Sequence, residues 1–426
     1  ICVAVGLLTA SGVLRSGDDA KPAARLEVHR GDHICFIGNT LADRMQHDGW
    51  LETYLYSRFP NDDLVIRDLG FSGDEIDLRL RSAGFGSPDE HLEKEKADVL
   101  FAFFGYNESF AGADGLERFK RSLENLIKHA RGQKYNGNSP PRLVLFSPIA
   151  NENLHDRNLP DGTENNQRLE LYTATMAEVA NANEIPFVDL YEPTLKIYRT
   201  AAKPLTINGV HLTEDGDKQL AEMIDGALFA GQPAPARNAA AMEKLRQAIV
   251  DKDLIFFNRY RTVDGYSIFG GRADLAFTDG QTNRVVAQRE MEVLDVMTAN
   301  RDRRIWAVAK GSDLKIDDSN TPPFIPVKTN FPGKNPDGTH IFLSGEDEIS
   351  KMTLGKGFKI NLFASEEQFP ELAKPVQMAF DAKGRLWVAA WPTYPHWKPK
   401  EEMNDKMLIF EDTKGTGRAD KCTVFA

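Results

Sequence analysis

The stretch HICFIGNTLADRMQ, residues 33–46, joins a short apolar run to a turn and a helix-like pattern. Its four apolar residues, Ile34–Ile37, predict a strand that is covered on both faces. Gly38 permits a sharp turn because it has no Cβ atom. Thr40 then stands before a helix N-terminus, where a nucleophile and oxyanion-binding amides can meet. Taken alone, the stretch favours a structural interpretation, with Thr40 as a helix N-cap and Asn39 as a turn residue.

Strand-like and helix-like segments alternate between about Leu26 and Gly231. Five apolar segments predict strands, at residues 33–37, 64–69, 97–104, 142–149 and 186–190. Amphipathic patterns predict helices between and after them, at residues 43–59, 115–131, 168–183 and 214–229. Such alternation is typical of a mostly parallel sheet with helices on both faces. In an α/β fold of this kind, functional residues gather at the carboxyl ends of the strands.

Composition limits the classes of function. The chain has 426 residues, enough for two or three domains, and its 27% charged residues are ordinary for globular protein. The net charge of −11 argues against non-specific binding of nucleic acid or anionic lipid. The three cysteines, Cys2, Cys35 and Cys422, form no pair with metal-ligand spacing and no haem-attachment motif. We therefore expect no metal and no cofactor within this chain, and no disulfide framework.

Polar residues and glycines follow the predicted strands in a definite order. Thr40 follows the first strand, Gly73 the second and Asn107 the third, and His211 lies just before the last helix. Each of these alone suits a turn, a cap or a surface position. Together they place a hydroxyl, a backbone amide, a side-chain amide and an imidazole at one sheet edge. That set favours a catalytic site.

This order of residues resembles the SGNH (GDSL-like) hydrolase family. The family's first block, Gly-Asp-Ser-Leu, matches residues 38–41, which read Gly-Asn-Thr-Leu. Its second-block glycine matches Gly73, and its third block, Gly-x-Asn-Asp, matches residues 105–108. Its last block, Asp-x-x-His, matches residues 208–211. The resemblance covers about half of the chain, and it implies a flavodoxin-like, three-layer α/β/α sandwich with ester-hydrolase activity.

The resemblance also implies a role for each matched residue. Thr40 takes the place of the nucleophilic serine, and His211 that of the base that removes its proton. Asn208 replaces the aspartate that orients the histidine. The oxyanion donors are the amides of Thr40 and Gly73 and the side chain of Asn107. Threonine can act as a nucleophile beside a base, although its methyl group restricts χ1.

Some alternatives remain open at this stage. A comparable aspartate-to-asparagine change in serine proteases costs ~10⁴ in turnover, because the histidine takes the wrong tautomer. A backbone carbonyl, Asp215 or Glu214 could orient the histidine instead. Ser72 and Ser109 are alternative nucleophiles, although neither occupies the position of the family's serine.

Further residues are candidates for substrate contact. Asn39 and Glu108 lie inside the matched blocks. Arg259 and Tyr260 belong to an Arg- and Tyr-rich stretch, of a kind that often binds anions or sugars and equally often forms a domain interface. We expect residues 233–310 to form a helical extension that covers the active-site edge, and residues 311–345 to form a linker.

The first residues are apolar and predict the remainder of a secretory signal. Residues 1–25 read as this leader and a polar linker, so we expect a secreted or periplasmic protein. The other interpretation is a short N-terminal membrane anchor. The chain also ends inside a strand-like pattern, which suggests a fragment of a longer protein.

The last 80 or so residues differ from the rest. Residues 346–426 alternate apolar and polar side chains around glycine turns, as antiparallel sheet does. They resemble the opening blade of the propeller dehydrogenase-like domains of planctomycete-type bacteria, which often accompany an SGNH-like domain and a haem module. Asp412, Asp420 and two glycines are similar to a Ca²⁺ loop. Lys414 and Thr416 stand where oxygen ligands are expected, so the sequence favours a solvated turn.

The sequence as a whole predicts an SGNH-like domain over residues 26–232. Its expected function is hydrolysis of a small or carbohydrate O-acyl ester by a Thr/His variant of the Ser-His-Asp mechanism. The alternative is a catalytically impaired domain that binds carbohydrate or contacts the propeller within the same chain. No nucleic-acid partner is expected.

Overall fold

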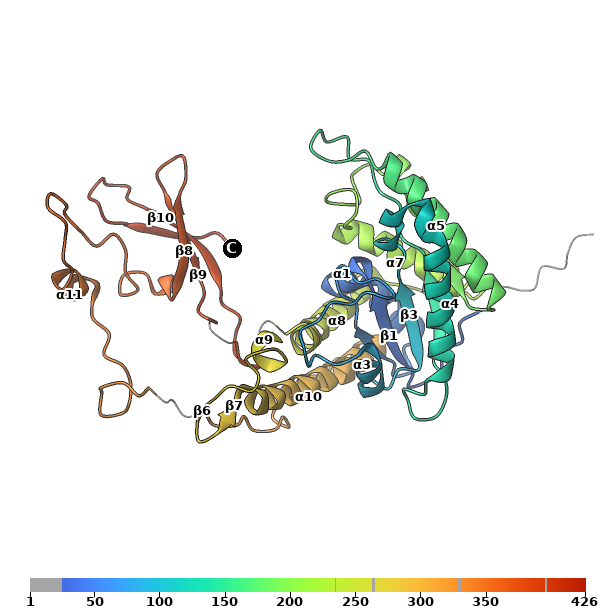
Figure 1. Ribbon diagram of the computed structural model, residues 1–426, viewed down its shortest axis with the longest axis horizontal. Helices are drawn as coiled ribbons and strands as arrows, with labels where there is room; N and C mark the ends of the chain where they lie inside the picture. Colours follow the sequence, from blue (N-terminus) through green and yellow to red (C-terminus); the bar gives the residue numbers. More distant parts are fainter. Residues whose placement is uncertain (1–24, 234, 263–264, 328–330, 395–396) are drawn as a thin grey trace, which may run out of the picture. The chain divides into compact units, whose positions relative to one another are not determined.

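The computed structural model describes residues 25–233, 235–262, 265–327, 331–394 and 397–426 (Figure 1). The predicted leader therefore lies outside the described residues. The chain divides into two compact units. The first unit comprises the described residues up to Leu80, together with Gly86–Leu254 and Arg301–Ile316. The second comprises Arg81–Phe85, Ile255–Asn300 and Asp317–Ala426.

A five-stranded parallel sheet forms the centre of the first unit. Its strands are β1 (His33–Gly38), β2 (Val65–Asp68), β3 (Val99–Phe103), β4 (Arg142–Phe146) and β5 (Phe187–Val188). They lie in the order β2-β1-β3-β4-β5, which is the flavodoxin-like order. The predicted strands are thus confirmed, and all but the first are shorter than their apolar segments. The register pairs Ile34 with Ile66 on one side and with Val99 on the other.

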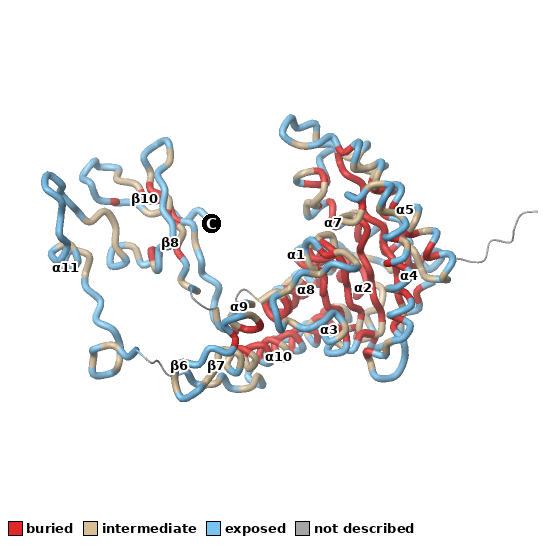
Figure 2. Tube along the Cα trace, viewed as in Figure 1, coloured by how far each residue is buried: buried red, intermediate tan, exposed pale blue. Residues whose placement is uncertain are grey.

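Helices cover both faces of this sheet and produce the predicted three layers. In Figure 1, α4 and α5 lie along one face, and α1 and α7 lie on the other. The helices of the first unit are α1 (Thr40–Asp48), α2 (Trp50–Arg58), α3 (Pro88–Lys94), α4 (Leu116–Gly132), α5 (Thr163–Ala182), α6 (Tyr191–Thr200) and α7 (Glu214–Leu228). Figure 2 shows that the buried residues concentrate in the sheet and in the helix faces turned toward it.

The single helix predicted over residues 43–59 is wrong, because the structure has two helices there. Gly49 ends α1 in the left-handed conformation, with φ of 69°, and donates its N–H to Met45 O. A glycine at this position adopts the left-handed conformation without the steric cost of a side chain. The chain turns at Gly49, and α2 packs against α7.

Stacked phenylalanine rings connect neighbouring strands of the sheet. The rings of Phe36 and Phe101 are stacked with centroids 5.4 Å apart. Those of Phe103 and Phe146 are stacked at 4.3 Å. All four side chains are buried within one hydrophobic cluster. These strands lie inside the sheet with helices on both faces, so both sets of alternating side chains are apolar.

Two long helices, α8 (Ala239–Tyr260) and α10 (Asn283–Ala309), run through the expected helical extension. Leu245 and Ile249 of α8 and Ile305 of α10 join the core of the first unit. Trp306 Nε1 donates a hydrogen bond of 2.7 Å to Leu64 O, just before the edge strand β2. The parts of both helices that belong to the first unit therefore extend its core beside β2.

The second unit contains a short hairpin and a separate antiparallel sheet. Its elements are α9 (Gly265–Ile268), β6 (Ala276–Thr278), β7 (Gln281–Thr282), α11 (Gly345–Ser350), β8 (Pro375–Phe380), β9 (Leu386–Ala390), β10 (Lys406–Glu411) and β11 (Lys421–Val424). The four C-terminal strands lie in the order β11-β10-β9-β8. The predicted antiparallel sheet is thus present. The assignment of this sheet to the first part of a propeller stays a prediction.

The loop that resembles a Ca²⁺ site is closed by its own backbone. The Asp412 carboxylate accepts hydrogen bonds from the N–H groups of Thr416, at 3.0 Å, and Gly417, at 2.7 Å. Asp420 accepts from the N–H and hydroxyl of Thr413, both at 2.8 Å. These bonds fit the solvated turn that the sequence favours.

Within the described residues, none of the helices combines the length and apolar character needed to cross a bilayer.

Candidate active site

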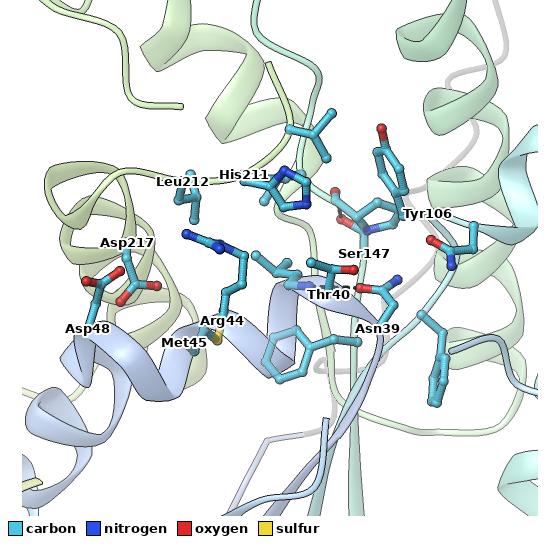
Figure 3. A pocket seen from close by; sticks show the side chains of 17 residues that line it. Asn39, Thr40, Arg44, Met45, Asp48, Tyr106, Ser147, His211, Leu212 and Asp217 are labelled. Carbon is cyan, nitrogen blue, oxygen red and sulfur yellow. Dashed lines mark hydrogen bonds between the residues drawn. The ribbon is translucent and has the colours of Figure 1, made fainter. Parts of the chain in front are cut away.

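A cavity of about 200 Å³ lies at the carboxyl ends of β1, β3 and β4. Its walls come from α1, from the segments after β3 and β4, and from the loop that leads into α7 (Figure 3). The lining residues are Asn39, Thr40, Leu41, Arg44, Met45, Asp48, Phe103, Phe104, Tyr106, Asn107, Ser147, Pro148, Ile149, Val210, His211, Leu212 and Asp217. Thr40, Asn107 and His211, which are far apart in the sequence, therefore face one cavity.

The turn after β1 brings Thr40 to this cavity. Gly38 has φ of 139°, and a Cβ atom there would lie 2.1 Å from Phe103 O. Only glycine fits this close approach of β1 and β3. Asn39 is the N-cap of α1, and its Oδ1 accepts the Leu41 N–H at 3.1 Å. Thr40 is then the first helical residue.

The Thr40 hydroxyl has no hydrogen-bond partner among the described residues. Because Asn39 caps the helix, the interpretation of Thr40 as the N-cap is wrong. Thr40 is half-buried, and its hydroxyl is free of the backbone. Its backbone N–H belongs to the first turn of α1, where helix amides attract negative charge. A hydroxyl and a first-turn helix amide thus meet at one residue.

His211 is held by Asn208. Asn208 Oδ1 accepts the backbone N–H of His211 at 2.9 Å and that of Val210 at 3.2 Å. These two donors fix which end of the amide is oxygen. His211 Nδ1 then lies 3.1 Å from Oδ1 and 2.9 Å from Nδ2 of Asn208. The residue that contacts the imidazole is therefore Asn208, and neither Asp215 nor Glu214 lines the cavity.

The environment of His211 favours the neutral imidazole. Burial lowers the pKa of His211 from its ordinary value, and the positive charge of Arg44 lowers it further. A base must be neutral to accept a proton, so this direction suits that role. No hydrogen bond joins His211 to the Thr40 hydroxyl among the described residues. In structures without substrate, such bonds are often long.

The loop that carries His211 is anchored by Glu152, which the sequence analysis did not single out. The Glu152 carboxylate is buried and accepts both the N–H and the hydroxyl of Thr206 at 2.7 Å. It also accepts the Leu205 N–H, and the Glu152 N–H donates to Gly209 O at 2.9 Å. A Cβ atom on Gly209 would lie 2.8 Å from Glu152 O. This close packing fixes the loop between α6 and α7.

Asn107 and Gly73 occupy different places relative to the cavity. Asn107 begins a 3₁₀ turn without using its side chain as a cap, and it lines the cavity. Gly73 sits at an exposed turn with φ of 86° and is not among the lining residues. The Ser72 hydroxyl donates to the buried Asp43 carboxylate, which ties this turn to α1. Whether the Gly73 amide joins the oxyanion site stays a prediction.

The remaining predicted substrate contacts serve other interactions. Glu108 accepts the N–H groups of Gly105, at 2.9 Å, and Ile76, at 3.0 Å, and so joins two loops. Arg259 lies in the second unit, where its Nε donates to Asp295 Oδ1 at 2.6 Å. Tyr260 is buried there beside the Phe85 ring. None of the three lines this cavity.

The alternative serine nucleophiles also have other partners. Ser109 is buried and donates to Tyr106 O at 2.6 Å, while Ser72 bonds to Asp43. Ser147 lines the cavity, but its hydroxyl accepts the Leu190 N–H at 2.8 Å.

Among the described residues, no three His, Cys, Asp or Glu side chains form a metal-binding group.

Sequence reasoning missed the charged end of the cavity. Arg44 and Asp48 follow Thr40 at intervals of four residues, so all three share one face of α1. That spacing was a usable signal. Asp217 lies on α7, and only the packing of α1 against α7 brings it to the same cavity.

Two segments of the chain match known family profiles. Residues 36–219 match the family profile described as GDSL-like Lipase/Acylhydrolase family, and residues 344–426 match a domain of unknown function, DUF7133. A search of curated proteins finds no match. Several solved structures are similar to the chain at low identity.

One of these is BT4096, described as a gut microbial diltiazem-metabolizing enzyme, with 19% identity and a TM-score of 0.39. The match covers 49% of each chain, so this chain spans about half the length of BT4096. The acetyl xylan esterase AlAXEase has 19% identity and a TM-score of 0.36, covering 46% of this chain and 99% of that chain. Axe2, an acetylxylan esterase from Geobacillus stearothermophilus, has 17% identity and a TM-score of 0.38, covering 50% and 100%. Residues 36–219 are thus similar to the GDSL-like Lipase/Acylhydrolase family by their match to its profile.

Proposed function

We propose that this domain hydrolyses carboxylic esters with Thr40 as nucleophile and His211 as base. The observation that carries the proposal is the free Thr40 hydroxyl in the cavity that His211 also lines. The side chain of Asn208 holds the imidazole at Nδ1, which leaves Nε2 as the nitrogen for proton transfer. Carbohydrate O-acyl esters are the substrates that we expect.

The reaction proceeds in two steps. In the first, His211 takes the Thr40 hydroxyl proton as Oγ1 attacks the ester carbonyl carbon. The imidazolium then gives this proton to the leaving alcohol, and the acyl group stays on Thr40. In the second step, His211 takes a proton from water, the hydroxide attacks the acyl carbon, and the released Thr40 oxygen regains a proton.

Three donors support the negative charge that develops on the carbonyl oxygen. The Thr40 N–H lies at the N-terminus of α1, and the Asn107 side-chain amide faces the same cavity. Donors placed where charge develops lower the barrier more than donors that bind only the substrate. Gly73 is a third donor in this proposal, and its turn is tied to α1 through Ser72 and Asp43.

The test is hydrolysis of p-nitrophenyl acetate by the full chain and by matched variants. We expect the activity of Thr40→Ala and of His211→Ala to fall to the background rate. The activity of Thr40→Ser should equal or exceed that of the wild type. The controls are Thr200→Ala and His129→Ala, which change exposed residues outside the cavity. Activity that survives in Thr40→Ala would exclude Thr40 as nucleophile.

A second candidate function follows from Asn208. Its Nδ2 lies 2.9 Å from His211 Nδ1 and can donate to it, which would place the ring proton on Nε2 and remove the base. The domain would then bind esters or carbohydrates without rapid turnover. Absence of hydrolysis in the wild type, together with saturable binding of an oligosaccharide, would favour this function.

A further inference from the structure

The catalytic cavity has a charged end that the proposed reaction does not use. Arg44 and Asp48 lie one and two turns of α1 beyond Thr40, which is about 6 Å and about 12 Å along the helix axis. Asp217 of α7 faces the same end. In Figure 3 these three side chains gather at one end of the cavity, away from Asn39 and Tyr106. The cavity is therefore long enough for more than the reacting ester group.

Some polar groups at this end lack partners among the described residues. Asp217 is 97% buried, and its Oδ2 makes no hydrogen bond to any described residue. Arg44 forms no ion pair with any residue that the structure describes. Burial raises the pKa values of Asp48 and Asp217, and the nearby charge of Arg44 opposes both shifts. A buried polar atom without a protein partner requires an explanation, and a ligand group that hydrogen-bonds to it would supply one.

The charged end lies on the side of the leaving alcohol. His211 gives its proton to the alcohol oxygen, so the alcohol half of the ester must lie next to the imidazole. Arg44 lines the cavity together with His211, and in Figure 3 its side chain extends toward His211 and Leu212. Met45 and Leu212 provide apolar wall beside these polar groups. The alcohol half therefore meets both polar and apolar surface.

We propose that Arg44, Asp48 and Asp217 bind two neighbouring hydroxyl groups of the alcohol, so that the substrates are esters of sugars or similar polyols. This inference rests on the proposed hydrolase function. Each hydroxyl can donate to a carboxylate and accept from the guanidinium. A carboxylate group on the ligand would face two aspartates, and an ammonium group would face Arg44. A neutral diol suits both signs of charge, and its carbon skeleton packs on Met45 and Leu212.

The kinetic test compares two acetates of similar size on the full chain. One is methyl β-xyloside with a single acetyl group, and the other is cyclohexyl acetate, which has no free hydroxyl. We expect the ratio of their kcat/KM values to favour the sugar ester. In Asp217→Asn and Arg44→Gln this ratio should fall at least tenfold, about 1.4 kcal/mol. Glu222→Gln, an exposed change of the same kind on α7, should keep the wild-type ratio.

A ratio that stays the same in both variants would overturn the inference, as would equal hydrolysis of the two acetates. If the wild type hydrolyses neither ester, the proposed Thr40 mechanism is wrong. A binding measurement then tests the diol site on its own. Methyl β-xyloside would then be titrated into Thr40→Ala by calorimetry. Binding that disappears in Thr40→Ala combined with Arg44→Gln supports the site. Absent binding, or binding that this change leaves intact, excludes it.

Discussion

Asn208 presents both an oxygen and a nitrogen to His211 Nδ1, at 3.1 Å and 2.9 Å respectively. If Nδ1 carries the proton, it donates to Oδ1 and leaves Nε2 free to act as a base. If Nδ2 donates to Nδ1 instead, the proton sits on Nε2 and the base is lost. A carboxylate at this position can only accept, so it would select the productive tautomer.

The first prediction follows from this pair. Asn208→Asp should raise kcat on p-nitrophenyl acetate at least tenfold, because it removes the competing donor. The reverse change in a serine protease costs ~10⁴ in turnover. The control is Asn183→Asp, which changes an asparagine at the C-terminal end of α5 outside the cavity. A rate that is unchanged or lower in Asn208→Asp would show that Asn208 already holds the productive tautomer.

The second prediction concerns pH. Burial and the charge of Arg44 both lower the pKa of His211, so the base stays neutral to a lower pH than free histidine does. The acid limb of the kcat/KM profile should therefore have its midpoint below about 6.5. Arg44→Gln removes a repulsion from the protonated ring, so it should move this midpoint to higher pH. Profiles of the two proteins on the same ester measure the shift, and a move to lower pH would contradict it.

The fold could be predicted from the sequence further than the cavity could. The strands are buried on both faces, so they appear as apolar runs such as Ile34–Ile37 that need no knowledge of partners. The break at Gly49 was missed, although a glycine after His47 and Asp48 is a common helix C-terminal signal. Asp217 could not have been placed beside Arg44, because no local pattern records the packing of α1 against α7.

The third prediction concerns a buried ion cluster in the first unit. Lys252 of α8 is fully buried, and its Nζ lies 2.7 Å from Glu52 Oε2 and 2.5 Å from Asp253 Oδ1. Lys252→Met removes the cation and leaves two buried carboxylates, which should lower the free energy of unfolding by about 3–5 kcal/mol. Urea titration monitored by tryptophan fluorescence measures this loss. Lys244→Met, an exposed change on the same helix, should cost less than about 1 kcal/mol.

The loss in Lys252→Met should also depend on pH. Burial raises the pKa of Glu52 well above its usual range and that of Asp253 above its own. A carboxyl group with a raised folded-state pKa stabilises the fold below its unfolded pKa, and this stability is lost as pH rises through the folded pKa. Without the lysine, the deficit should be larger at about pH 8 than at about pH 5. An equal deficit at both values would show that the carboxylates find other partners.

The fourth prediction tests Glu152 as a positioning residue for His211. Its carboxylate accepts hydrogen bonds from the Leu205 N–H, the Thr206 N–H and the Thr206 hydroxyl. Glu152→Gln places an N–H₂ group against backbone donors, at a cost of about 1–3 kcal/mol. We expect kcat to fall more than tenfold with little change in KM, because the His211 loop shifts while the rest of the cavity stays.

The matched control for Glu152→Gln is Glu164→Gln, an exposed change in the first turn of α5. Both variants are assayed well below their unfolding midpoints, so that lost stability alone does not lower the rate. If Glu152 only stabilises the fold, Glu152→Gln should lower the unfolding midpoint and leave the kcat of the folded protein unchanged. A lower kcat that Asn208→Asp partly restores in the double variant would instead show that Glu152 acts through the orientation of His211.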